Sequence, residues 1–131
     1  VLVKGNKILL SRRYNTGFHD GEYSFPAGHL KSNETLIQAL IREAKEETGI
    51  ELTPEDLRLV HVMHRKEPNE NRVNFFFAAE KWGGEPEIME PHKCDDLKWF
   101  GFSNLPDNTI PYIRQAIICA LQKIFYSEHG W

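Results

Sequence analysis

The segment at residues 28–50 constrains this chain most, because it specifies a helix whose two ends are both marked in the sequence. We predict the helix over residues 34–48. Ser32 or Asn33 precedes it and is suited to accept hydrogen bonds from the free amides of the first turn. Gly49 follows it and is typical of the residue that ends a helix in a left-handed conformation.

Acidic side chains gather on one face of this predicted helix. With about 3.6 residues per turn, Glu46 and Glu47 lie on the same face as Glu43. Glu34 stands in the first turn, where the helix dipole favours an acid. Like charges at this spacing destabilise a helix by roughly a few tenths of a kcal/mol unless a cation binds there. The neighbouring apolar face, which predicts packing on a sheet, consists of Ile37, Leu40, Ile41 and Ala44.

A cluster of carboxylates without histidine or cysteine suits a hard divalent ion. Oxygen ligands of this kind favour Mg2+, or Mn2+, over zinc. The alternative is that residues 42–47 are a solvated helix face, as most charge runs are. The wider spacing favours the metal site. The fixed positions are Gly28, Glu34, Arg42-Glu43-Ala44, Glu46-Glu47 and Gly49-Ile50.

This spacing resembles the complete signature sequence of the Nudix hydrolases. The resemblance implies an α/β (α+β) Nudix fold, in which a mixed β-sheet is sandwiched between α-helices. It implies a loop-helix-loop that binds one to three divalent ions. It also implies attack of water on a phosphorus of a nucleoside diphosphate that is linked to another group. The expected activity is therefore hydrolysis of a phosphoanhydride bond.

Individual roles follow from the resemblance position by position. Arg42 and Glu34 match residues that brace the loop against the helix in this family. Glu43 is one candidate for the general base, and the choice of base stays open because family members differ. The positions that match the metal ligands are the backbone carbonyl of Gly28 and the carboxylates of Glu43, Glu46 and Glu47.

The rest of the chain predicts a sheet with a second helix. Runs rich in Val, Phe and other strand formers alternate with short polar links. Strands and helices in this order favour an α+β or α/β sandwich. We expect strands at 1–4, 7–12, 57–65, 72–82 and 97–102, and a helix at 112–125.

Composition is that of one globular domain spanning residues 1–131, with 40% hydrophobic and 27% charged residues. A net charge of -3 argues against a nucleic acid polymer as partner. A small nucleotide as the ligand is what the Nudix resemblance implies. No apolar run approaches the roughly 20 residues of a membrane span. Cys94 and Cys119 lack metal-type spacing, which favours reduced thiols in a soluble, cytoplasmic protein. Monomer and homodimer stay equally open.

A second set of residues lies beyond the predicted helix. It consists of Trp82-Gly83-Gly84-Glu85-Pro86, Glu90, Trp99 and Leu105-Pro106-Asp107-Asn108. This set resembles MutT-type nucleoside triphosphate pyrophosphatases within the Nudix family. In those enzymes a glutamate of this loop reaches the metals or acts as the base, and Glu90 is the matching residue. The alternative is a solvated loop acid, like Glu85 and Glu87.

Three residues are candidates for substrate binding. In MutT-type enzymes an asparagine followed shortly by proline reads a purine base, and Asn108 with Pro111 resembles it, although one extra residue separates them here. An ordinary turn or an N-cap is the alternative for Asn108. Phe75 is a candidate for the apolar wall of a base pocket, and Arg12 for a phosphate contact. Core packing and solvent exposure are their respective alternatives.

The resulting hypothesis is hydrolysis of a nucleoside triphosphate to the monophosphate and pyrophosphate, including an oxidised purine nucleotide such as 8-oxo-dGTP. Two alternatives stay open. One is a pyrophosphatase for ADP-ribose, a nucleotide sugar or a dinucleoside polyphosphate. The other is a non-catalytic nucleotide-binding module, because a fold does not fix an activity. The presence of Glu43, Glu46 and Glu47 together favours catalysis.

Overall fold

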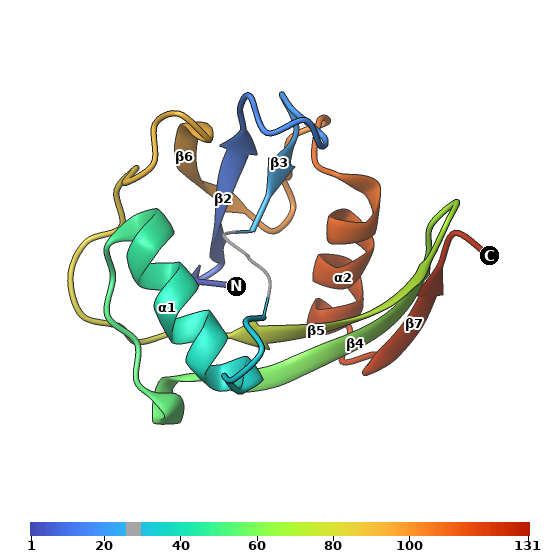
Figure 1. Ribbon diagram of the computed structural model, residues 1–131, viewed down its shortest axis with the longest axis horizontal. Coiled ribbons are helices and arrows are strands. Elements are labelled where there is room, and N and C mark those ends of the chain that lie inside the picture. The colour runs from blue at the N-terminus through green and yellow to red at the C-terminus, as the bar shows by residue number, and fades with distance from the viewer. Residues whose placement is uncertain (26–29) are drawn as a thin grey trace.

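The computed structural model describes residues 1–25 and 30–131, and its described strands form two sheets (Figure 1). In the first sheet, β2 pairs antiparallel with β1, β3 and β6. In the second sheet, β4 lies between β5, which is antiparallel to it, and β7, which is parallel. The strands are β1 (Val3–Lys4), β2 (Lys7–Arg13), β3 (Tyr23–Ser24), β4 (Arg58–Lys66), β5 (Asn71–Ala78), β6 (Cys94–Gly101) and β7 (Tyr126–His129).

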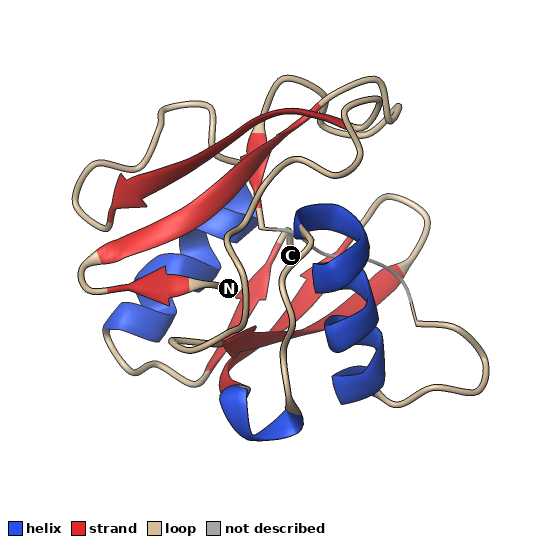
Figure 2. Ribbon diagram, turned by 90° about the vertical axis from the view of Figure 1, so that its left-hand side faces the viewer, coloured by secondary structure: helices blue, strands red, loops and turns tan. Residues whose placement is uncertain are grey.

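In the described part of the chain, two α-helices flank the strands. Figures 1 and 2 show α1 (Leu36–Thr48) on one side of the strands and α2 (Pro111–Leu121) on the other. A 3-10 turn, η1 (Pro54–Asp56), leads into β4. This arrangement confirms the predicted α+β sandwich of sheet between helices. It differs from the prediction in one respect, because the described strands divide into two sheets, which a β-bridge between Leu2 and Ala79 connects.

The start of α1 differs from the prediction. Thr35, rather than Ser32 or Asn33, is the N-cap, and the helix proper begins after Glu34. The reason is a reciprocal pair of hydrogen bonds, in which Gln38 N donates to Thr35 Oγ1 at 3.1 Å and Thr35 N donates to Gln38 Oε1 at 2.9 Å. Glu34 therefore lies just before the helix, and its Oε1 accepts a hydrogen bond from Lys31 N at 2.8 Å.

Two apolar clusters hold the helices against the sheets. Ile41 and Ala44 of α1 pack on buried residues of the first cluster, which are Leu2, Leu9, Ile50, Leu52 and Ala79. The second cluster lies under α2, whose Ile113, Ala116 and Ile117 pack with residues of both sheets, among them Ile8, Leu10, Met63 and Phe76. The predicted apolar face of α1 therefore positions its acidic face at the molecular surface. Among the described helices, none is long and apolar enough to span a bilayer.

The C-terminal end of the chain departs from the predicted helix over 112–125. The helix α2 ends at Leu121, and Lys123 adopts a left-handed conformation with φ 58°. The chain then turns back and adds β7 in parallel to β4, with Val62 opposite Tyr126. The buried side chain of His61 anchors this return, because its ring nitrogens contact Ile124 O at 2.8 Å and Ser127 Oγ at 2.7 Å.

Gly49 confirms the predicted end of α1 and generates a stability prediction. Its φ is 77°, and its N–H donates to Lys45 O at 3.0 Å. We expect Gly49→Ala to lower the free energy of unfolding by about 1 kcal/mol, because an L side chain is strained at this φ. Urea unfolding followed by circular dichroism measures this change.

Gly83→Ala is the matched control for Gly49→Ala. A Cβ added at Gly83 meets Glu51 Cβ at 3.6 Å, an ordinary contact, and no left-handed backbone is involved. We expect its free energy of unfolding to stay within about 0.5 kcal/mol of the wild type. Equal effects of the two substitutions would contradict the role given to Gly49.

Candidate active site

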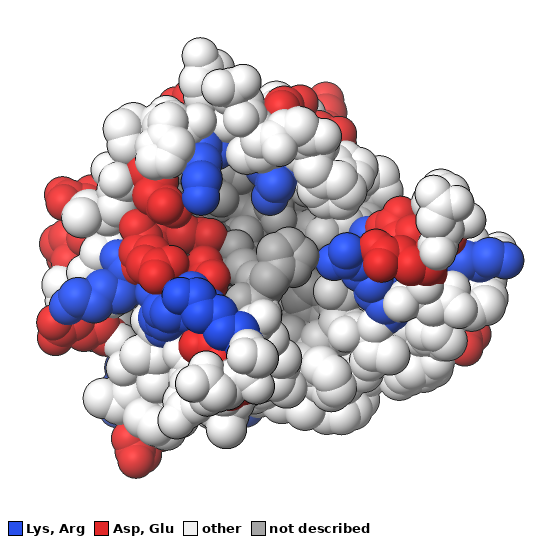
Figure 3. Space-filling view, in the orientation of Figure 1, with Lys and Arg blue, Asp and Glu red and all other residues white. Residues whose placement is uncertain are grey.

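A cleft of about 730 Å3 lies where α1, β2 and the loop before β6 meet. Glu43 and Glu47 line it from α1, and Arg12 and Arg13 line it from β2. Figure 3 shows a hollow on this face, with a cluster of acidic side chains on one side and basic side chains around its rim. Acids and bases from distant parts of the sequence thus face one space.

Arg42 lies at the centre of the acidic cluster. Its Nε donates to Glu34 Oε2 at 3.1 Å and its Nη2 to Glu34 Oε1 at 2.6 Å, which is a bidentate pair. Its Nη1 donates to Glu43 Oε1 at 2.6 Å and to Glu46 Oε2 at 3.2 Å. One guanidinium therefore joins the segment before α1 to two acids on the helix.

This network shifts the charge equilibria of Glu34 and Arg42. The hydrogen bonds from Arg42, together with the backbone N–H of Lys31, lower the pKa of Glu34 to about 2. The hydrogen bonds to Glu34 and Glu43 raise the pKa of Arg42 above its ordinary value. Both groups are charged near neutral pH, so Glu34 has no capacity to accept a proton there.

The loop before β6 is tied to the end of α1. Met89 N donates to Glu47 O at 3.2 Å, and Glu87 N donates to Thr48 O at 3.0 Å. These bonds place Glu90 in the lining of the same cleft as Glu43 and Glu47. Glu90 also forms an ion pair with Lys93 at 3.7 Å. Glu85 and Glu87, the two alternatives from the sequence, do not line the cleft.

The donor chemistry of the cleft fits a hard divalent ion. The carboxylates of Glu43, Glu47 and Glu90 are oxygen ligands of the type that Mg2+ prefers. Among the described residues, however, no three metal-ligating side chains converge on one point. Glu43 and Glu46 are instead turned toward Arg42. Gly28, whose carbonyl was expected to contribute, lies outside the described residues.

The three candidate substrate residues lie in different places. Arg12 lines the cleft, and its Nε donates to Asp95 Oδ1 at 2.7 Å. Phe75 is exposed and outside the cleft lining, because strand alternation turns its neighbour Phe76 into the core instead. Asn108 donates through Nδ2 to Gly21 O at 2.8 Å and holds the β2–β3 connection.

The role of Asn108 as an N-cap of the last helix is wrong, because Ile110 occupies that position. Its contact with Gly21 is instead a turn contact. Base recognition by Asn108 or Phe75 stays a prediction, and in this structure neither side chain lines the cleft.

Several cleft residues were not predicted from the sequence. Arg13, which follows Arg12 in β2, lines the same space. Its Nε donates to Phe18 O at 2.5 Å and its Nη2 to Thr16 Oγ1 at 3.1 Å, which fixes the loop after β2. For His92 and Lys93, the signal in the sequence was their position just after Glu90. The remaining polar side chains that line the cleft include Lys31, His92 and Lys93.

Comparison with known proteins decides the family. The family model described as "NUDIX domain" matches residues 1–120 of this chain. The chain belongs to the Nudix family. This confirms the family resemblance that the signature over residues 28–50 carries.

Nudix proteins with different assigned substrates are similar to this chain. The 8-oxo-dGTP diphosphatase of Escherichia coli (strain K12) is 27% identical over 121 residues, which are 92% of this chain and 90% of that protein. The NAD-capped RNA hydrolase NudC of Stutzerimonas stutzeri (strain A1501) is 30% identical over 98% of this chain and 43% of that protein. The ADP-ribose pyrophosphatase of Methanocaldococcus jannaschii is 32% identical over 81% of this chain and 61% of that protein.

Solved structures agree with the Nudix fold. The crystal structure of a MutT NUDIX hydrolase from Burkholderia pseudomallei superposes with a TM-score of 0.81 at 29% identity, covering 89% of this chain and 90% of that one. The chain spans less than half of the NudC relative and 61% of the ADP-ribose pyrophosphatase. The substrate of this chain is therefore a matter for proposal.

The lowered pKa of Glu34 generates a pH-dependence prediction. Because the folded-state pKa is lowered from 4.5 to about 2, Glu34 stabilises the fold above pH 4.5 and loses this contribution as pH falls through about 2. We expect Glu34→Gln to unfold at lower urea concentration than the wild type at pH 7. The difference should shrink between pH 4.5 and about 2.

Glu85→Gln is the control for this pH series, because Glu85 is an exposed loop acid outside the cleft. It removes the same formal charge, and we expect little change in the unfolding midpoint at either pH. A Glu34→Gln protein as stable as the wild type at pH 7 would contradict the stabilising role of the Arg42 pair.

Proposed function

We propose that this protein is a divalent-metal-dependent nucleoside triphosphate pyrophosphohydrolase, which releases the monophosphate and pyrophosphate. The observation that carries the proposal is one cleft that joins Glu43 and Glu47 of α1 with Glu90 and with Arg12. We propose an oxidised purine nucleotide such as 8-oxo-dGTP as the substrate. The similarity to the E. coli 8-oxo-dGTP diphosphatase, of which this chain covers 90%, supports this choice.

In this proposal the acids of the site bind the metal, and a basic residue of the cleft contacts the phosphates. Glu43, Glu46, Glu47 and Glu90, with the carbonyl of Gly28, are the proposed ligands of Mg2+ or Mn2+. When bound, the metal neutralises phosphate charge and activates the attacking water. A carboxylate of the cleft accepts the proton of that water, and Glu43 is the candidate on α1.

Arg42 has a positioning role in this proposal. Its bond to Glu43 holds one carboxylate at the cleft edge before any ligand arrives. Its bidentate pair with Glu34 fixes the guanidinium itself, since Glu34 stays ionised. Glu43 would hold the metal through a carboxylate oxygen, of which Oε1 accepts from Arg42 in this structure. Arg12 on the opposite wall is suited to contact a phosphate.

A second candidate substrate is ADP-ribose. The observation that favours it is 32% identity over 106 residues with the ADP-ribose pyrophosphatase. The same acids would serve this reaction, because the bond attacked is again a phosphoanhydride. Cys94 and Cys119 are both free thiols, which supports the proposed cytoplasmic location of either activity.

The acids of α1 are tested by Glu47→Gln. We expect this protein to fold normally, since Glu47 is not a core residue, and to lose turnover on the order of 100-fold or more, since a ligand charge is removed. The measurement is pyrophosphate release from nucleoside triphosphates with Mg2+. Wild-type turnover should disappear with chelator and return with Mg2+ or Mn2+.

Glu51→Gln is the matched control for Glu47→Gln, because Glu51 follows the same helix and pairs with Lys45 on the exposed surface. We expect it to turn over like the wild type. A Glu47→Gln protein of near-wild-type activity would contradict the assignment of that residue.

The substrate class is decided by a panel of ordinary and oxidised nucleoside triphosphates, ADP-ribose, nucleotide sugars and dinucleotides. Triphosphate preference with pyrophosphate as product supports the leading proposal. Preference for ADP-ribose or a dinucleotide leaves the proposed roles of the acids in place and contradicts the proposed triphosphate substrate. Folded protein that binds Mg2+ and hydrolyses none of them would contradict the enzymatic proposal and favour a binding module.

A further inference from the structure

The strand pair β2–β6 contains a bulge beside the cleft. Arg12 lies opposite Asp96, and Arg13 lies opposite Cys94, so Asp95 is the extra residue on β6. An extra residue of this kind bends a strand and changes the direction of its side chain, and bulges are enriched next to active sites. Here the bulged residue is a carboxylate that follows Cys94, a residue of the cleft lining.

Asp95 contacts the cleft residue Arg12 directly. The Nε of Arg12 donates to Asp95 Oδ1 at 2.7 Å, although 83 positions separate the two residues in sequence. This hydrogen bond is the largest cause that raises the pKa of Arg12. The guanidinium also lies over the ring of Tyr23, at 5.8 Å from its centroid. Arg12 is therefore held from two sides.

The neighbouring groups have different partners. The hydroxyl of Tyr23 donates to Asp96, so that carboxylate is already engaged. Arg13 is engaged by Phe18 O and Thr16 Oγ1 of its own loop. Among the described residues, the hydrogen bond of Arg12 is made by Nε to Asp95, and its two terminal amino groups are the ones offered to a ligand.

We propose that Asp95 is a positioning residue, which the bulge in β6 turns onto Arg12 so that the terminal amino groups of Arg12 meet the phosphates of a polyphosphate substrate. The proposal rests on the proposed function for the identity of the ligand. It assigns the ligand chemistry as a phosphate chain. Asp95 itself does not touch the substrate, since it is absent from the cleft lining.

A positioning role and a simple charge effect of Asp95 predict opposite changes in the dissociation constant of a phosphate ligand. A carboxylate near the cleft repels phosphate, so its removal alone would tighten the binding of an anion. If Asp95 orients Arg12, its removal weakens binding instead, because the guanidinium must then be ordered by the ligand. The sign of the change in the dissociation constant is therefore diagnostic.

The experiment is calorimetric titration of inorganic triphosphate into the protein in Mg2+ buffer, with Asp95→Asn as the test variant. We expect the dissociation constant to rise about tenfold, as for the loss of one charge-assisted hydrogen bond. In an Arg12→Ala background, the same substitution should change binding by less than about twofold, because the residue it positions is gone. Thermal unfolding confirms that each variant is folded.

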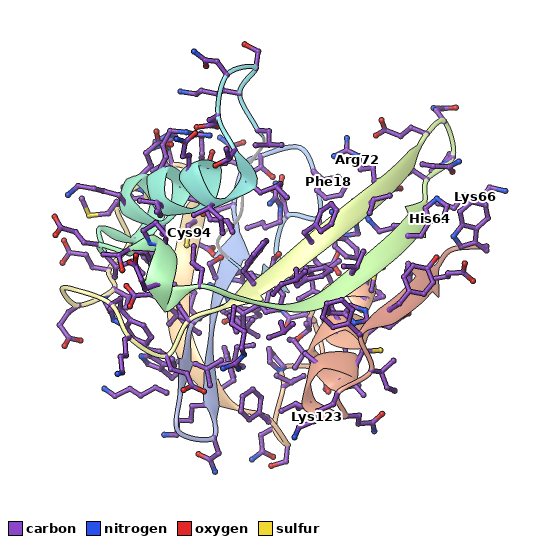
Figure 4. All side chains as sticks on the ribbon, turned by 90° about the horizontal axis from the view of Figure 1, so that it is seen from below. Phe18, His64, Lys66, Arg72, Cys94 and Lys123 are labelled. Carbon is purple, nitrogen blue, oxygen red and sulfur yellow. The ribbon has the colours of Figure 1, made fainter. Side chains whose placement is uncertain are left out.

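The matched control is Glu70→Gln. It removes the same charge and breaks the pair between Arg72 and Glu70, at 2.7 Å, which stands outside the cleft lining. Figure 4 shows Arg72 well apart from Cys94, the residue that precedes the bulge. Unchanged triphosphate binding by Glu70→Gln shows that net charge alone does not produce the effect at Asp95.

Kinetics with the substrate of highest turnover give a second readout. We expect Asp95→Asn to raise KM about tenfold with a much smaller change in kcat, since ordering of Arg12 is needed already for binding. Equal or tighter triphosphate binding by Asp95→Asn overturns the inference. So does a tenfold loss that persists without Arg12, or a wild type that binds no triphosphate. A wild type that binds triphosphate but has no turnover overturns the proposed function alone.

Discussion

The bidentate pair of Arg42 with Glu34 is the interaction on which the site depends. Acids on one helical face repel one another, and a single guanidinium with raised pKa offsets that repulsion from within the helix. Because Glu34 precedes α1, the same pair ties the incoming chain to the helix. Glu43 and Glu47 line the cleft, and Glu46, which stands outside that lining, stays half exposed beside Arg42.

The apolar side and the C-terminal end of α1 connect this network to the rest of the site. Its apolar side packs on Leu2, Leu9 and Ile50, which sets the helix against the first sheet. Its C-terminal carbonyls, at Glu47 and Thr48, accept from the loop that brings Glu90 to the cleft. Stability and function meet at this helix end, because the left-handed Gly49 lets the chain leave the helix there.

Local patterns predicted the elements that depend on local sequence. The helix face of α1, its end at Gly49 and the strands β4 and β5 follow from periodicity and propensity. The two-residue β3 and the late β7 were missed, because pairing with β2 and with β4 creates them. The contact of Arg12 with Asp95 could not be predicted from the sequence for the same reason. It depends on a bulge between β2 and β6, which come together only in the folded sheet.

The central claim is that the carboxylates of α1 and Glu90 bind the divalent ion that acts on the phosphate chain. A crystal structure with Mn2+ and a non-hydrolysable nucleoside triphosphate, with anomalous scattering from Mn2+, tests it most directly. The account predicts Mn2+ between Glu43, Glu47 and the phosphates, with Glu43 released from Arg42. Mn2+ bound elsewhere, or phosphates seated in the cleft with Glu43 still turned to Arg42 and no Mn2+ beside it, would contradict it.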